Sequence, residues 1–175
     1  MGPAARFSDE IEPRPPSVLS LAEAAEWSET WIGGKAATLA RLAQAGVLVP
    51  DGFCITSVAY ERFVQAGGLV RVIQSELGRK PLDQMRWEEI WDAALRLRSI
   101  FISMPIPVDT RRQILDALRG LGVGCRVAVR SSAPGEDSAE RSYAGLHESY
   151  LNVVGGQDVL HAVRLVWASL WSDAA

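Results

Sequence analysis

Glycine and proline divide this sequence into short segments, and these frequent turns limit the length of the helices and strands that the chain can form. Turn-forming runs separate the apolar stretches, among them Pro50-Asp51-Gly52, Gly67-Gly68 and Gly155-Gly156. Between these turns, apolar residues recur at alternate positions, as in strands, or at every third to fourth position, as in helices. Because the two kinds of segment interleave, we expect an α/β or α+β fold. The 175 residues suit one domain of ordinary size.

Composition excludes several classes of protein. With 48% hydrophobic and 22% charged residues, the chain is typical of a globular protein and not of a disordered one. No apolar run approaches the roughly 18 residues that span a bilayer, and no signal-peptide core is present, so we expect a cytoplasmic protein. The net charge of −3, without a basic run, argues against a nucleic-acid partner. Cys54 and Cys125 lie far apart in the sequence and predict two reduced, buried thiols.

Secondary structure follows from these patterns. Residues 1–16, with four prolines, are predicted to be a flexible leader, and residues 17–175 to form the domain. Strands are expected over residues 17–21, 53–56, 125–129 and 149–154. Helices are expected from Gly34 to the stop at Gly46, over residues 58–65 with Ser57 as cap, and over residues 70–77, 87–101, 109–118 and 159–171.

The spacing of apolar residues also predicts which side of each helix faces the core. In the helix that follows Gly34, the expected face comprises Ala36, Leu39, Leu42 and Ala43. In the helix over residues 87–101 it comprises Trp87, Ile90, Trp91, Ala94 and Phe101. The pairs Trp87/Trp91 and Trp167/Trp171 are expected to pack a core or cover a helix face, with stacking on a ligand as the alternative.

The run Gly33-Gly34-Lys35 opens a helix in a way that suits an anion. Glycine lets the backbone approach a ligand, while the N–H groups and the dipole of a helix start favour phosphate. Lys35 adds a mobile positive charge. The run is not a Walker A loop, which would need glycine where Glu29 stands and a hydroxyl residue after the lysine. A surface lysine beside a flexible cap is the open alternative.

Arg130 closes a predicted strand and is followed by Ser131-Ser132-Ala133-Pro134-Gly135. An arginine at a strand end can present its planar guanidinium to phosphate oxygens, and two hydroxyls add donors. The small residues of segment 142–145 continue the loop as a lid over a ligand would. The open alternative is a structural ion pair of Arg130 with Glu136 or Asp137, with the serines making turns.

Other groups carry weaker signals. Glu136, Asp137 and Glu140 crowd one loop and could ligate Mg²⁺, although loop carboxylates are usually solvated. His147 lies near this loop, whereas His161 is expected to pack or to lie on the surface. No arrangement of Ser, His and Asp for nucleophilic catalysis follows from the spacings.

Taken in order, the motifs of this sequence resemble one family. They are residues 32–39 (IGGKAATL), 46–53 (GVLVPDGF), 129–133 (VRSSA) with 136–137 (ED), and 142–145 (SYAG) with 150–153 (YLNV). Together they resemble the N-terminal nucleotide-binding domain of phosphoenolpyruvate synthase and pyruvate phosphate dikinase, which also occurs in rifampin phosphotransferase. The resemblance runs from about Leu19 to Trp171.

The resemblance implies the N-terminal half of an ATP-grasp-like fold that holds Mg-ATP. In such a domain the lysine of the GGK motif and the arginine of the RSSA motif contact ATP phosphates, and the glycine-rich segment lies over them. The site residues implied for this chain are Lys35, Arg130, Gly34, Ser131, Ser132 and Gly145.

The resemblance also implies parts that this sequence lacks. The family's second half of the nucleotide domain supplies Mg²⁺-binding carboxylates and much of the adenine pocket, and a separate domain carries the phosphorylated histidine. We therefore expect ATP and Mg²⁺ as cofactors, metal ligands outside this chain, and those two absent parts as partners. With no catalytic residue of its own, the chain is expected to bind and not to turn over substrate.

Two alternatives belong to other classes. One is a non-catalytic truncated module that docks to a separately encoded partner, for which the apolar end of the last helix (Val166, Trp167, Leu170, Trp171) would form an exposed face. The other is an unrelated domain with chance motifs. It predicts that Lys35 and Arg130 lie far apart, whereas the leading interpretation predicts that their charged ends converge on one cleft.

Overall fold

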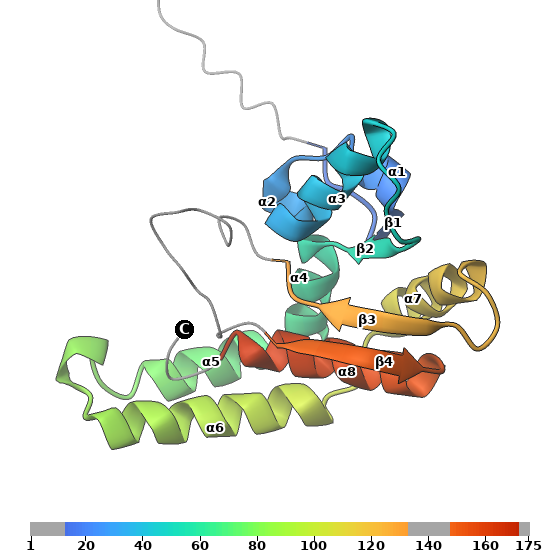
Figure 1. Ribbon diagram of the computed structural model, residues 1–175. Coiled ribbons are helices and arrows are strands. Elements are labelled where there is room, and N and C mark those ends of the chain that lie inside the picture. The colour runs from blue at the N-terminus through green and yellow to red at the C-terminus, as the bar shows by residue number, and fades with distance from the viewer. Residues whose placement is uncertain (1–12, 133–147, 172–175) are drawn as a thin grey trace, which may run out of the picture.

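The structure is a computed structural model that describes residues 13–132 and 148–171 (Figure 1). It contains both helices and strands, which confirms the expected mixed class. In chain order they are β1 (Val18–Ser20), α1 (Leu21–Ala24), α2 (Glu29–Ile32), α3 (Gly34–Gln44), β2 (Phe53–Ile55), α4 (Ser57–Ala66), α5 (Leu69–Leu77), the 3₁₀ turn η1 (Leu82–Gln84), α6 (Trp87–Ser103), α7 (Val108–Gly120), β3 (Arg126–Arg130), β4 (Ser149–Val154) and α8 (Gly156–Ser169).

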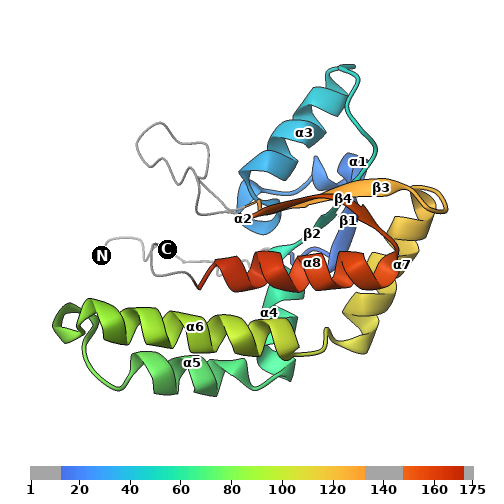
Figure 2. The same cartoon turned by 60° about the horizontal axis from the view of Figure 1, so that its bottom comes forward.

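The described strands form two antiparallel pairs. Strand β1 pairs with β2, and β3 pairs with β4, where Arg130 lies opposite Ser149. The β3–β4 register shifts between Val127 and Val129. Helix α8 lies beneath this second pair and against α6 on its other side, as Figure 2 shows. The strand that ends in Arg130 is therefore supported by a layered helical base.

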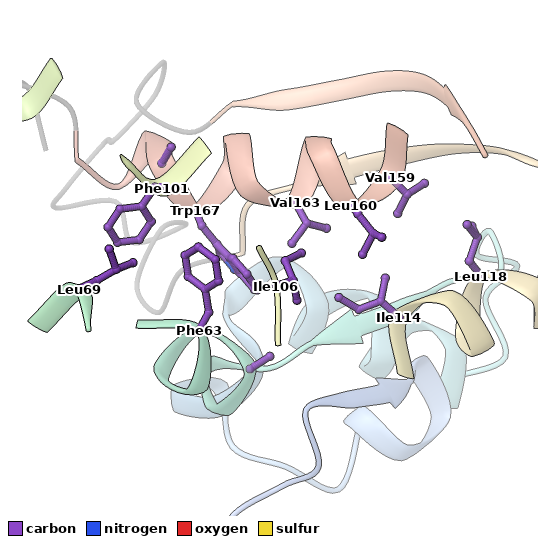
Figure 3. Close-up of a cluster of buried hydrophobic side chains, with 12 residues drawn as sticks. Phe63, Leu69, Phe101, Ile106, Ile114, Leu118, Val159, Leu160, Val163 and Trp167 are labelled. Atoms are coloured by element: carbon purple, nitrogen blue, oxygen red, sulfur yellow. The ribbon is translucent and has the colours of Figure 1, made fainter. Parts of the chain in front are cut away.

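That base contains the larger of two apolar clusters, which we call the aromatic core (Figure 3). Phe63 of α4 lies 4.8 Å from Trp167 of α8 and 5.6 Å from Phe101 of α6, measured between ring centroids. Burying one such side chain contributes about 2–3 kcal/mol. The buried members are Ala59, Phe63, Leu69, Phe101, Ile106, Ile114, Leu118, Val159, Leu160, Val163, Trp167 and Ala168.

The second apolar cluster lies under α1–α3 and consists mostly of small side chains. Four of its seven buried members are alanines, so we call it the alanine cluster. Small side chains allow α1 and α3 to approach each other closely. Its members are Leu19, Ala24, Ile32, Ala36, Ala37, Ala40 and Cys54.

This packing corrects the predicted face of α3. The helix buries Gly34, Ala36, Ala37 and Ala40. Leu42 is 39% exposed, so its predicted place in the core is wrong. At about 100° per residue, Leu42 lies on the side of the helix opposite to the side that buries Ala37 and Ala40. Leu39 and Ala43, also predicted to face the core, are only half-buried.

The predicted face of α6 is correct for Phe101 and wrong for its first turns. The helix buries Ala93, Leu97 and Phe101, whereas Trp87 and Trp91 are 63% and 43% exposed. The two indoles stack on each other along the outer side of α6, with centroids 6.3 Å apart. They cover a helix face and stay out of the aromatic core.

The end of α8 corrects another expectation. Trp167 is buried in the aromatic core, and Trp171 packs against it and donates its indole N–H to the Tyr60 hydroxyl. Val166 is half-buried, and Leu170 is 37% exposed. The predicted exposed apolar face is therefore largely covered by the chain's own core, and the docking-module alternative loses the observation that favoured it.

Smaller differences concern the ends of elements. Thr56, not Ser57, is the N-cap residue of α4, and its hydroxyl donates to the Pro16 carbonyl at 2.8 Å instead of capping the helix. Strand β3 is displaced by one residue from its prediction and includes Arg130. Cys54 is buried as expected, whereas Cys125 is only half-buried.

The leader predicted over residues 1–16 lies mostly outside the described residues. Three of its last residues contact the fold: Pro15 is buried, the Pro16 carbonyl accepts from Thr56, and Arg14 pairs with Glu61 at 2.7 Å and lies over the Trp31 ring. Among the described helices, none has the length and apolar character to cross a membrane.

Candidate functional site: the start of α3 and the end of β3

The first half of the site is the start of α3, which a single glycine shapes. Gly33 ends α2, where its N–H donates to the Glu29 carbonyl at 2.7 Å, and it is also the N-cap residue of α3. Its φ of +78° lies in the left-handed region that glycine adopts without strain. Its carbonyl accepts the first bond of α3 from Ala37 N–H at 3.0 Å. The helix start therefore follows a sharp turn that needs glycine.

The residues that follow Gly33 carry the predicted anion-binding groups. Gly34 is the buried first residue of α3, and Lys35 is its half-buried second residue. Lys35 already interacts with another group of the chain, so a phosphate would join or replace that contact. The positive end of the helix dipole adds to the lysine charge at this place.

A buried thiol supports this turn from below. The Cys54 Sγ of β2 donates to the carbonyl of Ile32, at 3.6 Å, directly before Gly33. Burial raises the pKa of the Cys54 thiol to about 12, because the charged thiolate would lose its hydration there. The thiol is therefore a neutral donor at ordinary pH, and it ties the end of α2 to β2.

The second half of the site is the end of β3. Val127 and Val129 pack towards the aromatic core, so strand alternation turns Arg126 and Arg130 to the exposed side. Arg130 is the last residue of the strand and is exposed. Ser131, the next residue, is 5% exposed.

The two halves meet at Ser132. Its hydroxyl oxygen accepts a hydrogen bond from the Ala36 N–H of α3 at 3.0 Å, across 96 residues of sequence. A Cβ placed on Gly33 would collide with the carbonyl oxygen of Ser132, so the strand end passes directly over the glycine. Figure 2 shows the end of β3 beside α2 and the start of α3. The backbone segments that carry Lys35 and Arg130 therefore lie next to each other, while the convergence of their charged ends on one cleft stays a prediction.

Several predicted residues lie outside the described part of the chain. These are Gly145 with the rest of segment 142–145, the acidic residues Glu136, Asp137 and Glu140, and His147. The alternative ion pairs of Arg130 lie there too. Within the described ranges, no group of three His, Cys, Asp or Glu residues is placed to hold a metal. His161 is exposed on α8, so of its two expected places, packed or on the surface, it takes the second.

Sequence reasoning missed the structural role of Ser132. It placed Ser132 among the ligand-binding groups, whereas the structure engages its oxygen with α3. One signal was present: glycine at the N-cap position supplies no side-chain acceptor, so the first-turn N–H groups need a partner from elsewhere.

The arrangement combines a helix start, a lysine, an arginine and two serines, all of which favour a polyanion. It contains no described general base or nucleophile paired with one. These groups suit anion binding and charge neutralisation, so the junction is a candidate phosphate-binding site.

Comparisons with known proteins agree with this class. Residues 29–175 match the family described as pyruvate phosphate dikinase, AMP/ATP-binding domain. The chain belongs to that family.

Its relatives are much longer proteins with several names. The chain is 46% identical over 149 residues to the phosphoenolpyruvate synthase of Aeropyrum pernix, covering 82% of this chain and 18% of that protein. It is 33% identical over 145 residues to the rifampicin phosphotransferase of Bacillus cereus, covering 82% of this chain and 16% of the relative. It is also 35% identical over 144 residues to the prodigiosin synthesizing transferase PigC of Serratia marcescens, covering 82% and 14%. The chain thus spans less than a fifth of each of these relatives.

Proposed function

We propose that this chain binds the phosphates of ATP between the start of α3 and the end of β3. The observation that carries the proposal is the junction at Ser132, which joins the GGK turn to the strand end that carries Arg130. Membership of an AMP/ATP-binding domain family supports ATP as the ligand. The proposed contacts are Lys35 and Arg130 to phosphate oxygens, with Gly34, Ser131 and Gly145 beside them and Ser132 joining the two halves of the site.

The two cations perform distinct tasks in this proposal. Arg130 offers a planar fork that can hold two phosphate oxygens at once, whereas Lys35 offers a flexible point charge near the helix start. Together they offset part of the negative charge of a triphosphate, and the positive end of the α3 dipole adds to this effect. Positioning and charge neutralisation are what phosphoryl transfer asks of a protein.

We further propose that the chain is the first half of an ATP-grasp-like domain in a dikinase-type phosphotransferase. In the complete protein, ATP held here would donate a phosphoryl group to a histidine on a separate domain. Mg²⁺, when bound with ATP, would neutralise charge on the transferring group, and we place its protein ligands outside the described residues. The relatives carry three different names, so the final acceptor depends on parts beyond this chain. The two free cysteines agree with a cytoplasmic location.

Calorimetric titration with Mg-ATP tests the proposal. We expect saturable binding by the chain and at least a tenfold loss of affinity in Arg130→Ala, because one charge-assisted phosphate contact contributes about 1.5–3 kcal/mol. Arg126→Ala is the matched control, since Arg126 is an exposed arginine at the other end of the same strand. Absence of saturable binding, or equal losses in both variants, would contradict the proposal.

A further inference from the structure

Helix α3 begins without an N-terminal cap of its own. Its N-cap residue is Gly33, which has no side chain to accept a first-turn N–H. The acceptor comes instead from Ser132, at the far end of β3, whose hydroxyl oxygen lies 3.0 Å from Ala36 N. This is the geometry of an N-cap bond to the third helical residue, supplied across the fold.

We propose that Ser132 is a positioning residue for the nucleotide site and caps α3 from the end of β3. The inference rests on the proposed function, because positioning has meaning only if Lys35 and Arg130 share one ligand. Ser132 lies two residues after Arg130, and its partner Ala36 lies one residue after Lys35. The hydrogen bond therefore links the two backbone segments that carry Lys35 and Arg130, the residues proposed to bind phosphate.

A second contact holds the same junction. The backbone of Ser132 passes so close to Gly33 that no side chain fits between them. Gly33 also has a positive φ, which glycine adopts without strain. The strand end is thus fixed at two points of α3, its N-cap residue and its third residue. Two points of contact hold the position of the strand end and limit its rotation about either one.

The junction is partly shielded from water, which strengthens its hydrogen bond. Ser131 is buried, Ser132 is half-buried, and residue Ala36 is 8% exposed. Removing the hydroxyl oxygen would leave the Ala36 N–H without its partner in a place of limited hydration. The start of α3 would then fray, and the backbone that carries Lys35 would lose its fixed position.

A positioning role differs measurably from direct contact with ATP. The cap exists before nucleotide binds, so it protects the Ala36 amide from hydrogen exchange in the free protein. It also acts through Lys35, so its loss should matter less once the lysine has gone. A direct ligand would protect Ala36 only with nucleotide present and would leave its exchange in the free protein unchanged.

The test combines amide exchange, followed by NMR, with Mg-ATP titration on the whole chain. Ser132→Ala should speed exchange of the Ala36 amide at least fivefold without nucleotide and weaken Mg-ATP binding about fivefold, the scale of a lost helix cap. Ser132→Thr, which keeps the hydroxyl, should restore both. Ser149→Ala is the matched control, since Ser149 is an exposed serine opposite Arg130 in the same strand pair.

Each outcome decides one part of the account. Unchanged Ala36 exchange in Ser132→Ala overturns the cap itself. Faster exchange with unchanged affinity leaves a cap and overturns the positioning role. An equal loss of affinity from Ser132→Ala in the wild-type and Lys35→Ala backgrounds also overturns it, because a residue that acts through Lys35 should matter less once the lysine has gone. Failure of the unaltered protein to bind Mg-ATP contradicts the proposed function, while the exchange data still report on the cap.

Discussion

The two apolar clusters of this protein are built on opposite principles. The aromatic core fills its space with large rings from α4, α6 and α8, and Phe63 and Phe101 are almost fully buried. In the alanine cluster, the helix backbones pack close together, because side chains such as Ala24 and Ala40 occupy little volume. The first cluster gains stability from side-chain contact area, whereas the second allows helices and turns to approach closely.

This difference explains where the candidate site lies. A phosphate site built from a helix start needs backbone N–H groups near the surface and a strand end nearby. The alanine cluster brings these together at Gly33 and Ser132, while the aromatic core supports β3 from beneath. The comparison predicts that losing volume harms the aromatic core and that adding volume harms the alanine cluster.

The largest effect is expected from emptying the aromatic core. Phe63→Ala should lower the free energy of unfolding by about 4 kcal/mol, since Phe63 contacts both Phe101 and Trp167 and its loss leaves a cavity. Urea denaturation measures this change. Phe63→Leu, which keeps most of the volume, is the control and should cost roughly 1 kcal/mol. Similar costs for both variants would mean that this core is not tightly packed.

The next effect comes from adding one methyl group at the junction. Gly33→Ala should cost about 3 kcal/mol, because the new Cβ meets the Ser132 carbonyl oxygen in addition to the strain of a positive φ. Gly46→Ala is the matched control, with the same φ of +78° and nothing within 4 Å of the new atom. It should cost about 1 kcal/mol. Equal unfolding free energies for the two variants would contradict the close approach of the Ser132 backbone to Gly33.

Enlarging the alanine cluster should cost somewhat less. Ala40→Leu adds volume where Ala40 is 1% exposed, so we expect destabilisation of about 2 kcal/mol by overpacking. The control is Ala43→Leu on the same helix, where the half-buried side chain has room to turn outwards and the cost should stay below about 0.5 kcal/mol. Thermal and urea unfolding both report the difference. A neutral Ala40→Leu would show spare space in this cluster.

The smallest effect is a pH dependence carried by Cys54. Burial raises the pKa of the folded thiol from 9.0 to about 12, so the folded state favours the protonated form. Stability from this thiol is complete below pH 9 and is lost as pH rises towards 12; at pH 10 the loss is about 1 kcal/mol. Cys54→Ala should remove this part of the alkaline decline in unfolding free energy. Cys125→Ala should keep it, and a decline that is identical in wild type and Cys54→Ala would contradict the assignment.

Local patterns predicted much of this fold. Alternating and helical spacings located every described strand and every described helix of eight or more residues to within a few residues, and Arg130 lies at a strand end as the sequence indicates. The GGK turn does begin a helix. These features depend on neighbours in the sequence, which a single sequence displays.

Other features depend on partners far along the chain. Spacing alone did not show which side of α3 faces the core, because packing against α1 selects the side that carries Ala37 and Ala40 and leaves Leu42 exposed. Trp87 and Trp91 also followed the helical pattern and still face outwards. The bond between Ser132 and Ala36 spans 96 residues, so only the missing cap at Gly33 hinted that a partner was needed.

The measurement that tests the central claim most directly is a double-mutant cycle on Mg-ATP affinity, with Lys35→Ala, Arg130→Ala and the combined variant. Lys80→Ala and Arg126→Ala remove the other lysine and the other exposed arginine of β3 as controls. If both cations hold one triphosphate, the combined loss should differ from the sum of the single losses by at least about 0.5 kcal/mol, while the controls leave affinity unchanged. Strictly additive losses, or single losses no larger than those of the controls, would contradict a shared phosphate site.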